Sequence, residues 1–191
     1  MFVDGGAFDG DTLRSVLTAG NSFERYIAFE PDSRNYRALE CYVATLPAGV
    51  SARVEMSPAA AYSTRARMRI DGAGSASAVL VEASGDVSGD DVECVPLDEY
   101  LGERAITFVK LDIEGAEPDA LLGARHIIAR DRPVLAVCVY HSQNHLWRLP
   151  LLIDSLVDDY CYYLRPYNEE AWDLVCYAVP VERALHVRTR A

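Results

Sequence analysis

The chain contains a single lysine, Lys110, and its 18 Lys and Arg residues are outnumbered by 29 Asp and Glu, which gives a formal net charge of -11. An acidic surface repels phosphate backbones, so we expect no nucleic-acid partner. The arginines between Arg65 and Arg69 form the only candidate basic patch. We interpret them as the solvated face of a strand.

Long apolar runs are also missing. No segment approaches the roughly 18–20 apolar residues of a membrane span, and no charged leader precedes an apolar stretch, so we predict neither a span nor a signal peptide. The five cysteines contain no C-x-x-C pair, and four of them lie in apolar runs. This pattern favours reduced, buried cysteines and a cytoplasmic location over a disulfide or zinc framework.

Two nucleotide-binding signatures are absent as well. The sequence has no G-x-x-x-x-G-K-[ST], which disfavours a P-loop for ATP. The glycine turn near the N-terminus reads D-G-G-A-F-D-G instead of the dinucleotide spacing G-x-G-x-x-G. Any nucleotide-like ligand of this turn is therefore expected to lack a pyrophosphate.

What is present is a 191-residue chain in which half of the residues are hydrophobic, enough for one domain over residues 1–191 with a sizeable core. Short apolar runs alternate with segments of helical periodicity, which predicts an α/β fold with a parallel sheet. Strands are expected at 1–3, 26–29, 50–55, 106–112 and 133–140, followed by an antiparallel pair at 160–165 and 174–179. Two helices are expected to begin near Asp11 and Asp32, which are placed to cap them, and two more are expected around Pro118–Ile128 and around Leu146–Leu156.

The middle of the chain has a different pattern. Short strands are expected at 59–62, 65–70 and 92–95, separated by Gly/Ser/Asp-rich stretches at 71–77 and 84–91. We interpret this region as an elaborated third strand with a hairpin and a surface loop, and not as a linker between domains.

Polar residues end four of the expected strands. They are Asp4, Glu30, Asp112 and His141. Ligands of open parallel sheets bind outside the carboxyl ends of the strands, so one ligand would account for all four residues. Glu30 is placed to accept both hydroxyls of a ribose, and Asp4 and Asp112 are placed to hold a cationic amino group.

An adenosine with a positively charged, non-phosphate tail satisfies these requirements, and S-adenosylmethionine is such a molecule. Gly5 and Gly6 would let the backbone approach it closely. Two alternatives stay open at this point: an NAD(P)-dependent oxidoreductase and a non-catalytic, nucleotide-binding Rossmann-like module.

Four segments, MFVDGGAFDGDT, YIAFEPD, VPLDEYL and FVKLDIEGAEPDALLGA, resemble the FkbM-type S-adenosylmethionine-dependent methyltransferases. The resemblance extends to VYHSQNHLWRLP and covers residues 1 to about 180. It implies a Rossmann-like class I methyltransferase fold: a seven-stranded, mostly parallel sheet that ends in an antiparallel hairpin, with helices on both faces. It also implies O-methylation of a hydroxyl on a sugar, glycolipid or natural product.

The resemblance and the strand ends together define the expected site. Asp112 and Glu114, from K-L-D-I-E-G-A-E, would face the methionine end of the cofactor and the acceptor. The first strand would begin at residue 1, so an acceptor lid would be missing, supplied by a second subunit of a homodimer, or part of a longer protein. The expected cofactor contacts are Asp4, Gly5, Gly6, Ala7, Thr12, Glu30, Pro31 and Asp112.

Catalysis of O-methyl transfer calls for a group that helps the hydroxyl lose its proton. His141 is the first candidate base, Glu114 is the second, and Asp112 completes the expected catalytic set. His141 and His145 could join the two carboxylates around a divalent metal, but their i,i+4 spacing requires a helix where a loop is expected, so we predict no metal. Tyr140 and Trp147 could line an acceptor pocket or lie in the core, and we favour the core because aromatic residues beside apolar periodicity are usually core side chains.

Overall fold

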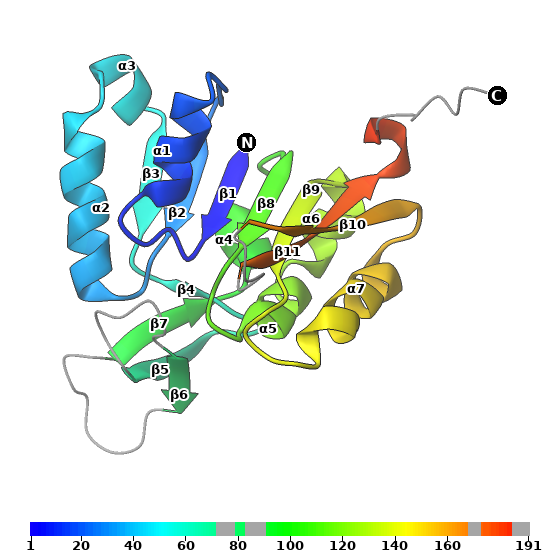
Figure 1. The fold of residues 1–191 in the computed structure, drawn as a ribbon. Coiled ribbons are helices and arrows are strands. Elements are labelled where there is room, and N and C mark those ends of the chain that lie inside the picture. Colours follow the sequence, from blue (N-terminus) through cyan, green and yellow to red (C-terminus); the bar gives the residue numbers. More distant parts are fainter. Residues whose placement is uncertain (72–78, 83–90, 168–172, 185–191) are drawn as a thin grey trace.

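The computed structural model describes residues 1–71, 79–82, 91–167 and 173–184 (Figure 1). Apart from Asp71 and Asp91, the two predicted Gly/Ser/Asp-rich stretches lie outside these ranges. No helix within the described ranges is long and apolar enough to cross a membrane. All five cysteines are free, and Cys94, Cys138 and Cys176 are buried as expected.

A seven-stranded sheet forms the centre of the molecule, in the order β10-β11-β9-β8-β1-β2-β3 (Figure 1). Within this sheet β1, β2, β3, β8 and β9 pair in parallel, and β11 is antiparallel to both of its neighbours. The predicted class I methyltransferase topology is therefore confirmed. The strands are β1 (Phe2–Gly5), β2 (Tyr26–Phe29), β3 (Val54–Ser57), β8 (Phe108–Leu111), β9 (Val134–Cys138), β10 (Tyr160–Pro166) and β11 (Leu174–Pro180).

Helices cover both faces of this sheet, because alternate strand residues point to opposite sides. Val3 and Ile27 face the larger core, and Tyr26 and Ala28 face the smaller one. Helices α1 (Asp11–Thr18) and α2 (Ser33–Thr45) cover the smaller core. The larger core lies under α4 (Leu97–Leu101), α5 (Glu117–Leu122), α6 (Arg125–Asp131) and α7 (His145–Leu156).

The helices that follow β1 and β2 have different N-terminal caps. Asp32 caps α2 as predicted, because its carboxylate accepts hydrogen bonds from the backbone N–H groups of Arg34 (2.8 Å) and Asn35 (3.0 Å). Asp11 does not cap α1: Gly10, at φ 89°, occupies the cap position and Asp11 is the first helical residue. A Cβ at Gly10 would lie 2.6 Å from the Tyr42 ring, so only glycine fits there.

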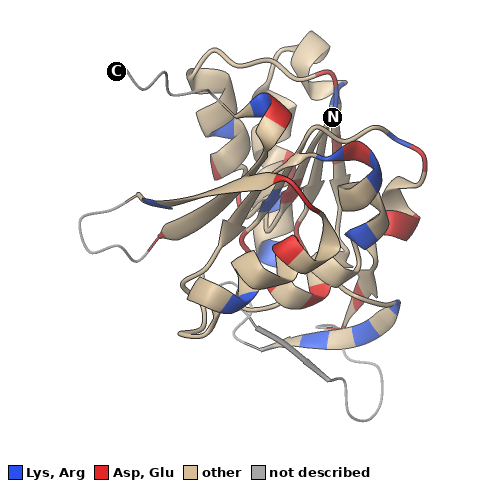
Figure 2. Ribbon diagram, turned by 90° about the vertical axis from the view of Figure 1, so that its right-hand side faces the viewer, with Lys and Arg blue, Asp and Glu red and all other residues tan. Residues whose placement is uncertain are grey.

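A second sheet replaces the predicted elaboration of the third strand. It has the order β4-β7-β5-β6, with β4 (Ala60–Ala61), β5 (Ala66–Asp71), β6 (Val79–Glu82) and β7 (Asp91–Val95). Figure 2 shows the basic residues of β5 as blue bands close together. Acidic partners balance part of this charge: Arg65, next to β5, pairs with Glu93 at 3.0 Å and with Glu99 at 2.6 Å, and Arg69 pairs with Asp91 at 3.5 Å.

Two further predictions are corrected by tertiary contacts. Residues 50 and 51 belong to α3 (Ala48–Ser51), and β3 begins only at Val54. The single helix expected around Pro118–Ile128 is divided into α5 and α6 next to Gly123, where a Cβ would lie 1.9 Å from the Tyr62 carbonyl oxygen. The carboxylate of Asp98 then accepts from the second helix's first-turn N–H groups.

Candidate active site

A cavity of about 260 Å³ opens at the carboxyl ends of β1, β2 and β8. Its walls come from the turn after β1, the Glu30-Pro31-Asp32 segment after β2 and the turn after β8. The apolar side chains of Phe8, Phe29 and Ile113 line it, and carboxylates stand at both ends. The second sheet contributes Ala60, Ala61 and Ile70 to the same walls.

Glu30 is fixed at one end of the cavity by two backbone N–H groups. Its Oε2 accepts from Phe8 at 2.8 Å and its Oε1 from Asp32 at 2.9 Å. Only 5% of the residue is exposed, and burial raises the pKa of its carboxyl despite these hydrogen bonds. Each carboxylate oxygen retains a lone pair, so Glu30 can still accept hydrogen bonds from a ligand.

The opposite end is formed by the turn after β8. Asp112 and Glu114 line the cavity there, together with Tyr140 from the segment after β9. The Tyr140 hydroxyl donates to Oδ1 of Asp112 at 3.1 Å. The polar end of the site is therefore assembled from two neighbouring strands.

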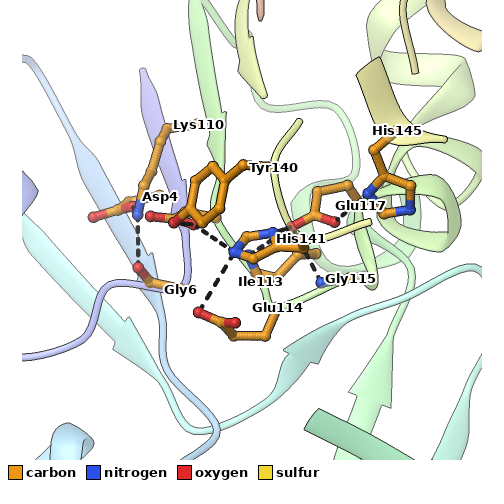
Figure 3. Close-up of polar contacts among 11 residues, drawn as sticks. Asp4, Gly6, Lys110, Ile113, Glu114, Gly115, Glu117, Tyr140, His141 and His145 are labelled. Atoms are coloured by element: carbon orange, nitrogen blue, oxygen red, sulfur yellow. Dashed lines mark hydrogen bonds and ion pairs between the residues drawn. The ribbon is translucent and has the colours of Figure 1, made fainter. Parts of the chain in front are cut away.

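Glu117 holds this turn in place from behind. It is fully buried, and its Oε1 accepts from the backbone N–H of Ile113 at 3.0 Å and from Nδ1 of His141 at 2.8 Å (Figure 3). Glu114 adopts φ 54° and Gly115 adopts φ 102°, which turns the chain sharply between Asp112 and Glu117. A positive φ is strained for glutamate, and such strain is typical of functional sites.

His141 faces two of the carboxylates that line the cavity, those of Asp112 and Glu114. Its Nε2 lies 3.4 Å from Oδ1 of Asp112 and 3.5 Å from Oε1 of Glu114 (Figure 3). Burial alone would lower the pKa of His141, but Glu114 and Glu117 outweigh it and raise the pKa to about 10. The neighbouring carboxylates therefore favour the protonated imidazole over the neutral form that a general base requires.

A sequence profile of the methyltransferase FkbM domain matches residues 4–170. The chain belongs to the FkbM methyltransferase family. S-adenosylmethionine is therefore its cofactor, and the alternative of an NAD(P)-dependent oxidoreductase is set aside. The cavity fits this cofactor, because it combines apolar walls, a carboxylate that can accept from a ribose and acidic groups suited to a cation.

Solved structures agree with this family. The methyltransferase FkbM of Methylobacillus flagellatus KT superposes with a TM-score of 0.77 at 29% identity, over 93% of this chain and 42% of that chain. This chain thus spans less than half of that protein. No curated protein sequence matches the chain.

Two more distant neighbours show the fold alone. The Aeropyrum pernix fibrillarin with bound S-adenosyl-L-methionine has a TM-score of 0.57 at 11% identity, over 93% of this chain and 65% of that chain. The putative rRNA methylase of Clostridium thermocellum has a TM-score of 0.54 at 10% identity, over 93% and 86%.

In this FkbM domain Asp4 does not line the cavity, contrary to its predicted contact with the cofactor's amino group. It is fully buried, 3.0 Å from the Lys110 ammonium and 2.5 Å from the Tyr26 hydroxyl. Burial lowers the pKa of Lys110, but Asp4 and Asp112 outweigh it and keep that pKa above its ordinary value. The Lys110 ammonium also donates to the Gly6 carbonyl at 2.7 Å, so the ion pair fixes the turn that borders the cavity.

The other predicted cofactor contacts divide into two groups. Gly6 and Pro31 line the cavity of about 260 Å³, whereas Gly5, Ala7 and Thr12 do not. A Cβ at Gly6 would lie 1.9 Å from the Asp112 carbonyl oxygen, and one at Gly5 would lie 2.9 Å from a Leu111 methyl group. These glycines therefore allow the turn after β1 to pack on β8, which is a reason for glycine that the sequence did not predict.

Several residues that shape the site were not predicted. Glu117 lies in the same K-L-D-I-E-G-A-E run as Asp112 and Glu114, and that run is the signal that could have identified it. Tyr140 lines the cavity, which was the less favoured of its two predicted positions, and Trp147 is 54% exposed, so the favoured interpretation as core side chains was wrong. His145 is buried, with Nδ1 3.4 Å from Oε2 of Glu117.

Replacing Lys110 should destabilise the protein strongly. We expect Lys110→Met to lower the free energy of unfolding by about 3–5 kcal/mol, because it leaves the Asp4 carboxylate buried without its cation. The double variant Asp4→Asn/Lys110→Met should lose at least about 1 kcal/mol less than the sum of the two single variants. Urea unfolding of all three measures these differences.

The matched control is Arg14→Met, because Arg14 pairs with Asp9 at 3.8 Å on the surface. It should change the stability by less than about 1 kcal/mol. Additive losses in the double variant would show that Lys110 and Asp4 do not interact as described.

Proposed function

We propose that this FkbM domain transfers a methyl group to a hydroxyl of a small acceptor, such as a sugar, a glycolipid or a natural product. The observation that carries this proposal is the meeting of Asp112, Glu114 and His141 at the cavity end opposite Glu30. A hydroxyl is a poor nucleophile at neutral pH, and this group of side chains can orient it and favour loss of its proton.

The cofactor would lie between the two ends. When bound, S-adenosylmethionine supplies a methyl group on a positively charged sulfur. Glu30 would accept hydrogen bonds from the ribose hydroxyls, Phe8 and Ile113 would contact apolar parts of the ligand, and Asp112 would face its amino group. The carboxylates favour a cationic ligand over a phosphate-bearing one.

Oxygen is a better acceptor atom than an amine nitrogen at this site. An amine near the carboxylates of Asp112 and Glu114 would be held as an ammonium, which has no free lone pair for the methyl group. A hydroxyl is neutral and can donate its proton to a neighbouring acceptor. The chemistry of the cluster therefore supports O-methylation.

The remaining features of the proposal concern the whole chain. Residues 1–191 would form one domain, since Ala60 and Ile70 of the second sheet line the same cavity as Glu30. The net charge of -11 supports a small acceptor over a nucleic acid. The five free cysteines are typical of a reducing compartment such as the cytoplasm.

The test is a screen for transfer of isotopically labelled methyl groups from S-adenosylmethionine to hydroxyl-bearing glycans, glycolipids and natural products. S-adenosylhomocysteine should raise the melting temperature, and NAD and NADP should not. Label in an amine or a nucleic acid would contradict the proposal. Binding of S-adenosylhomocysteine with no transfer to any acceptor would favour the non-catalytic module.

The Glu30→Ala variant should bind S-adenosylhomocysteine at least tenfold more weakly, which corresponds to about 1.4 kcal/mol, because the ribose loses its acceptor. Isothermal titration calorimetry measures the change. Glu103→Ala is the control, since the Glu103 side chain is 99% exposed. Equal affinities in the two variants would show that Glu30 does not hold the ribose.

The His141→Ala variant should turn over about a hundredfold more slowly, because the acceptor end loses the side chain that orients Asp112 and Glu114. Its affinity for S-adenosylhomocysteine should stay within about twofold of the unmodified chain, since His141 does not line the cofactor cavity. His126→Ala, which alters an exposed histidine of α6, is the control. Full turnover in His141→Ala would exclude a role for this imidazole.

A further inference from the structure

We propose that Asp112, Glu114 and His141 bind one divalent metal ion, and that this ion holds the acceptor hydroxyl. The first half of the proposal concerns metal binding alone and is independent of the reaction. The second half rests on the proposed O-methyl transfer. The sequence had predicted no metal, because the i,i+4 spacing of His141 and His145 required a helix.

The three side chains have the spacing of a ligand set. One ligand atom from each lies within 4.8 Å of the other two. Nε2 of His141 is 3.4 Å from the Asp112 oxygen and 3.5 Å from the Glu114 oxygen. Neighbouring ligands of an ion with bonds of about 2.1 Å lie about 3.0 Å apart at a right angle and about 3.4 Å apart in a tetrahedron. The observed distances therefore leave room for an ion with little movement.

The imidazole of His141 is directed at this space. Its side chain is only 5% exposed, and its Nε2 makes no hydrogen bond to any residue that the structure describes. Nδ1 is held at 2.8 Å by the buried Glu117, which selects the form that donates from Nδ1 and leaves the Nε2 lone pair for a metal (Figure 3). A carboxylate behind a ligating histidine is a recurrent feature of metal sites.

The charges around His141 also favour a cation. Three carboxylates, those of Asp112, Glu114 and Glu117, surround one imidazole. Lys110 is already paired with Asp4 at 3.0 Å. A divalent ion in place of the Nε2 proton would offset more of this negative charge than the proton does.

The backbone holds the ligands in place before any ion arrives. Glu117 accepts from the N–H groups of Ile113 (3.0 Å) and Gly115 (3.4 Å), and Glu114 keeps a positive φ of 54° between them. This geometry directs the Glu114 carboxylate towards His141 (Figure 3). Ligands fixed in this way lose little conformational entropy on binding.

The ion would face the acceptor. Asp112 and Glu114 line the cavity, so coordination positions not taken by the three side chains open towards it. An oxygen bound there loses its proton to water more readily, because the ion stabilises the alkoxide. The alkoxide then forms its bond to the methyl carbon as the carbon–sulfur bond breaks, and S-adenosylhomocysteine leaves as the neutral thioether.

The ligand set indicates which ion to use as a probe. Two carboxylates and one imidazole suit Mn²⁺, which accepts both oxygen and nitrogen ligands and tolerates open positions. His145 is not part of the set, because its Nδ1 lies 3.4 Å from Oε2 of Glu117 and it contacts that carboxylate instead.

Electron paramagnetic resonance tests the site directly, because free Mn²⁺ gives a six-line spectrum that weakens when the ion binds. The full chain should bind one Mn²⁺ per molecule. Glu114→Gln and His141→Gln should each raise the dissociation constant at least about tenfold. Glu103→Gln, the same change at an exposed glutamate, should leave it within about twofold.

Glu114 is partly exposed, so Glu114→Gln keeps the test valid if His141→Gln fails to fold. If the spectrum of free Mn²⁺ does not weaken when the chain is mixed with millimolar Mn²⁺, the proposal is overturned. Equal dissociation constants for the unmodified chain and Glu114→Gln would also overturn it. Calorimetry with S-adenosylhomocysteine in EDTA reports cofactor binding separately.

The two proposals fail in distinguishable ways. Cofactor binding and O-methyl transfer that persist at full rate in EDTA would overturn the role of the ion and leave the proposed function intact. Mn²⁺ binding that depends on Glu114, without methyl transfer to any hydroxyl, would support the metal site and overturn the proposed function.

Discussion

The arrangement of the site depends on one buried carboxylate, that of Glu117. It accepts hydrogen bonds from the backbone after β8 and from His141, which follows β9. A buried carboxylate is costly unless its oxygens accept hydrogen bonds, so these donors satisfy Glu117 and Glu117 holds them in place. Asp112 and Glu114 consequently reach the cavity together with a histidine from the neighbouring strand.

A second buried interaction, the ion pair of Asp4 with Lys110, fixes the turn after β1, which packs against the turn after β8. Asp4 and Lys110 stand on adjacent parallel strands and pair at 3.0 Å, and Lys110 also donates to the Gly6 carbonyl. Gly6 lies so close to the Asp112 carbonyl that any side chain would collide with it. These contacts fix the carboxyl ends of β1 and β8 against each other, and Asp112 after β8 lines the same cavity as Glu30 after β2.

Much of this architecture could be predicted from the chain. The bounds of β2 and the cap at Asp32 follow from local pattern, and Glu30 lies at the cavity end where its strand predicts it. Other elements could not be predicted, because their signals are nonlocal. The helix break at Gly123 comes from contact with Tyr62, which is distant in sequence. The second sheet pairs short segments whose local pattern also fits a hairpin.

The sequence by itself determined the order of strands and helices, the family and the acids at the strand ends, since these follow from periodicity and short motifs. Only the tertiary structure decided which acids share a space. Asp4 is neutralised by Lys110 inside the sheet, whereas Glu117, three residues beyond Glu114, holds His141 between two carboxylates. The physical reason is that charge pairing and burial depend on neighbours brought together by folding, which spacing along one chain does not specify.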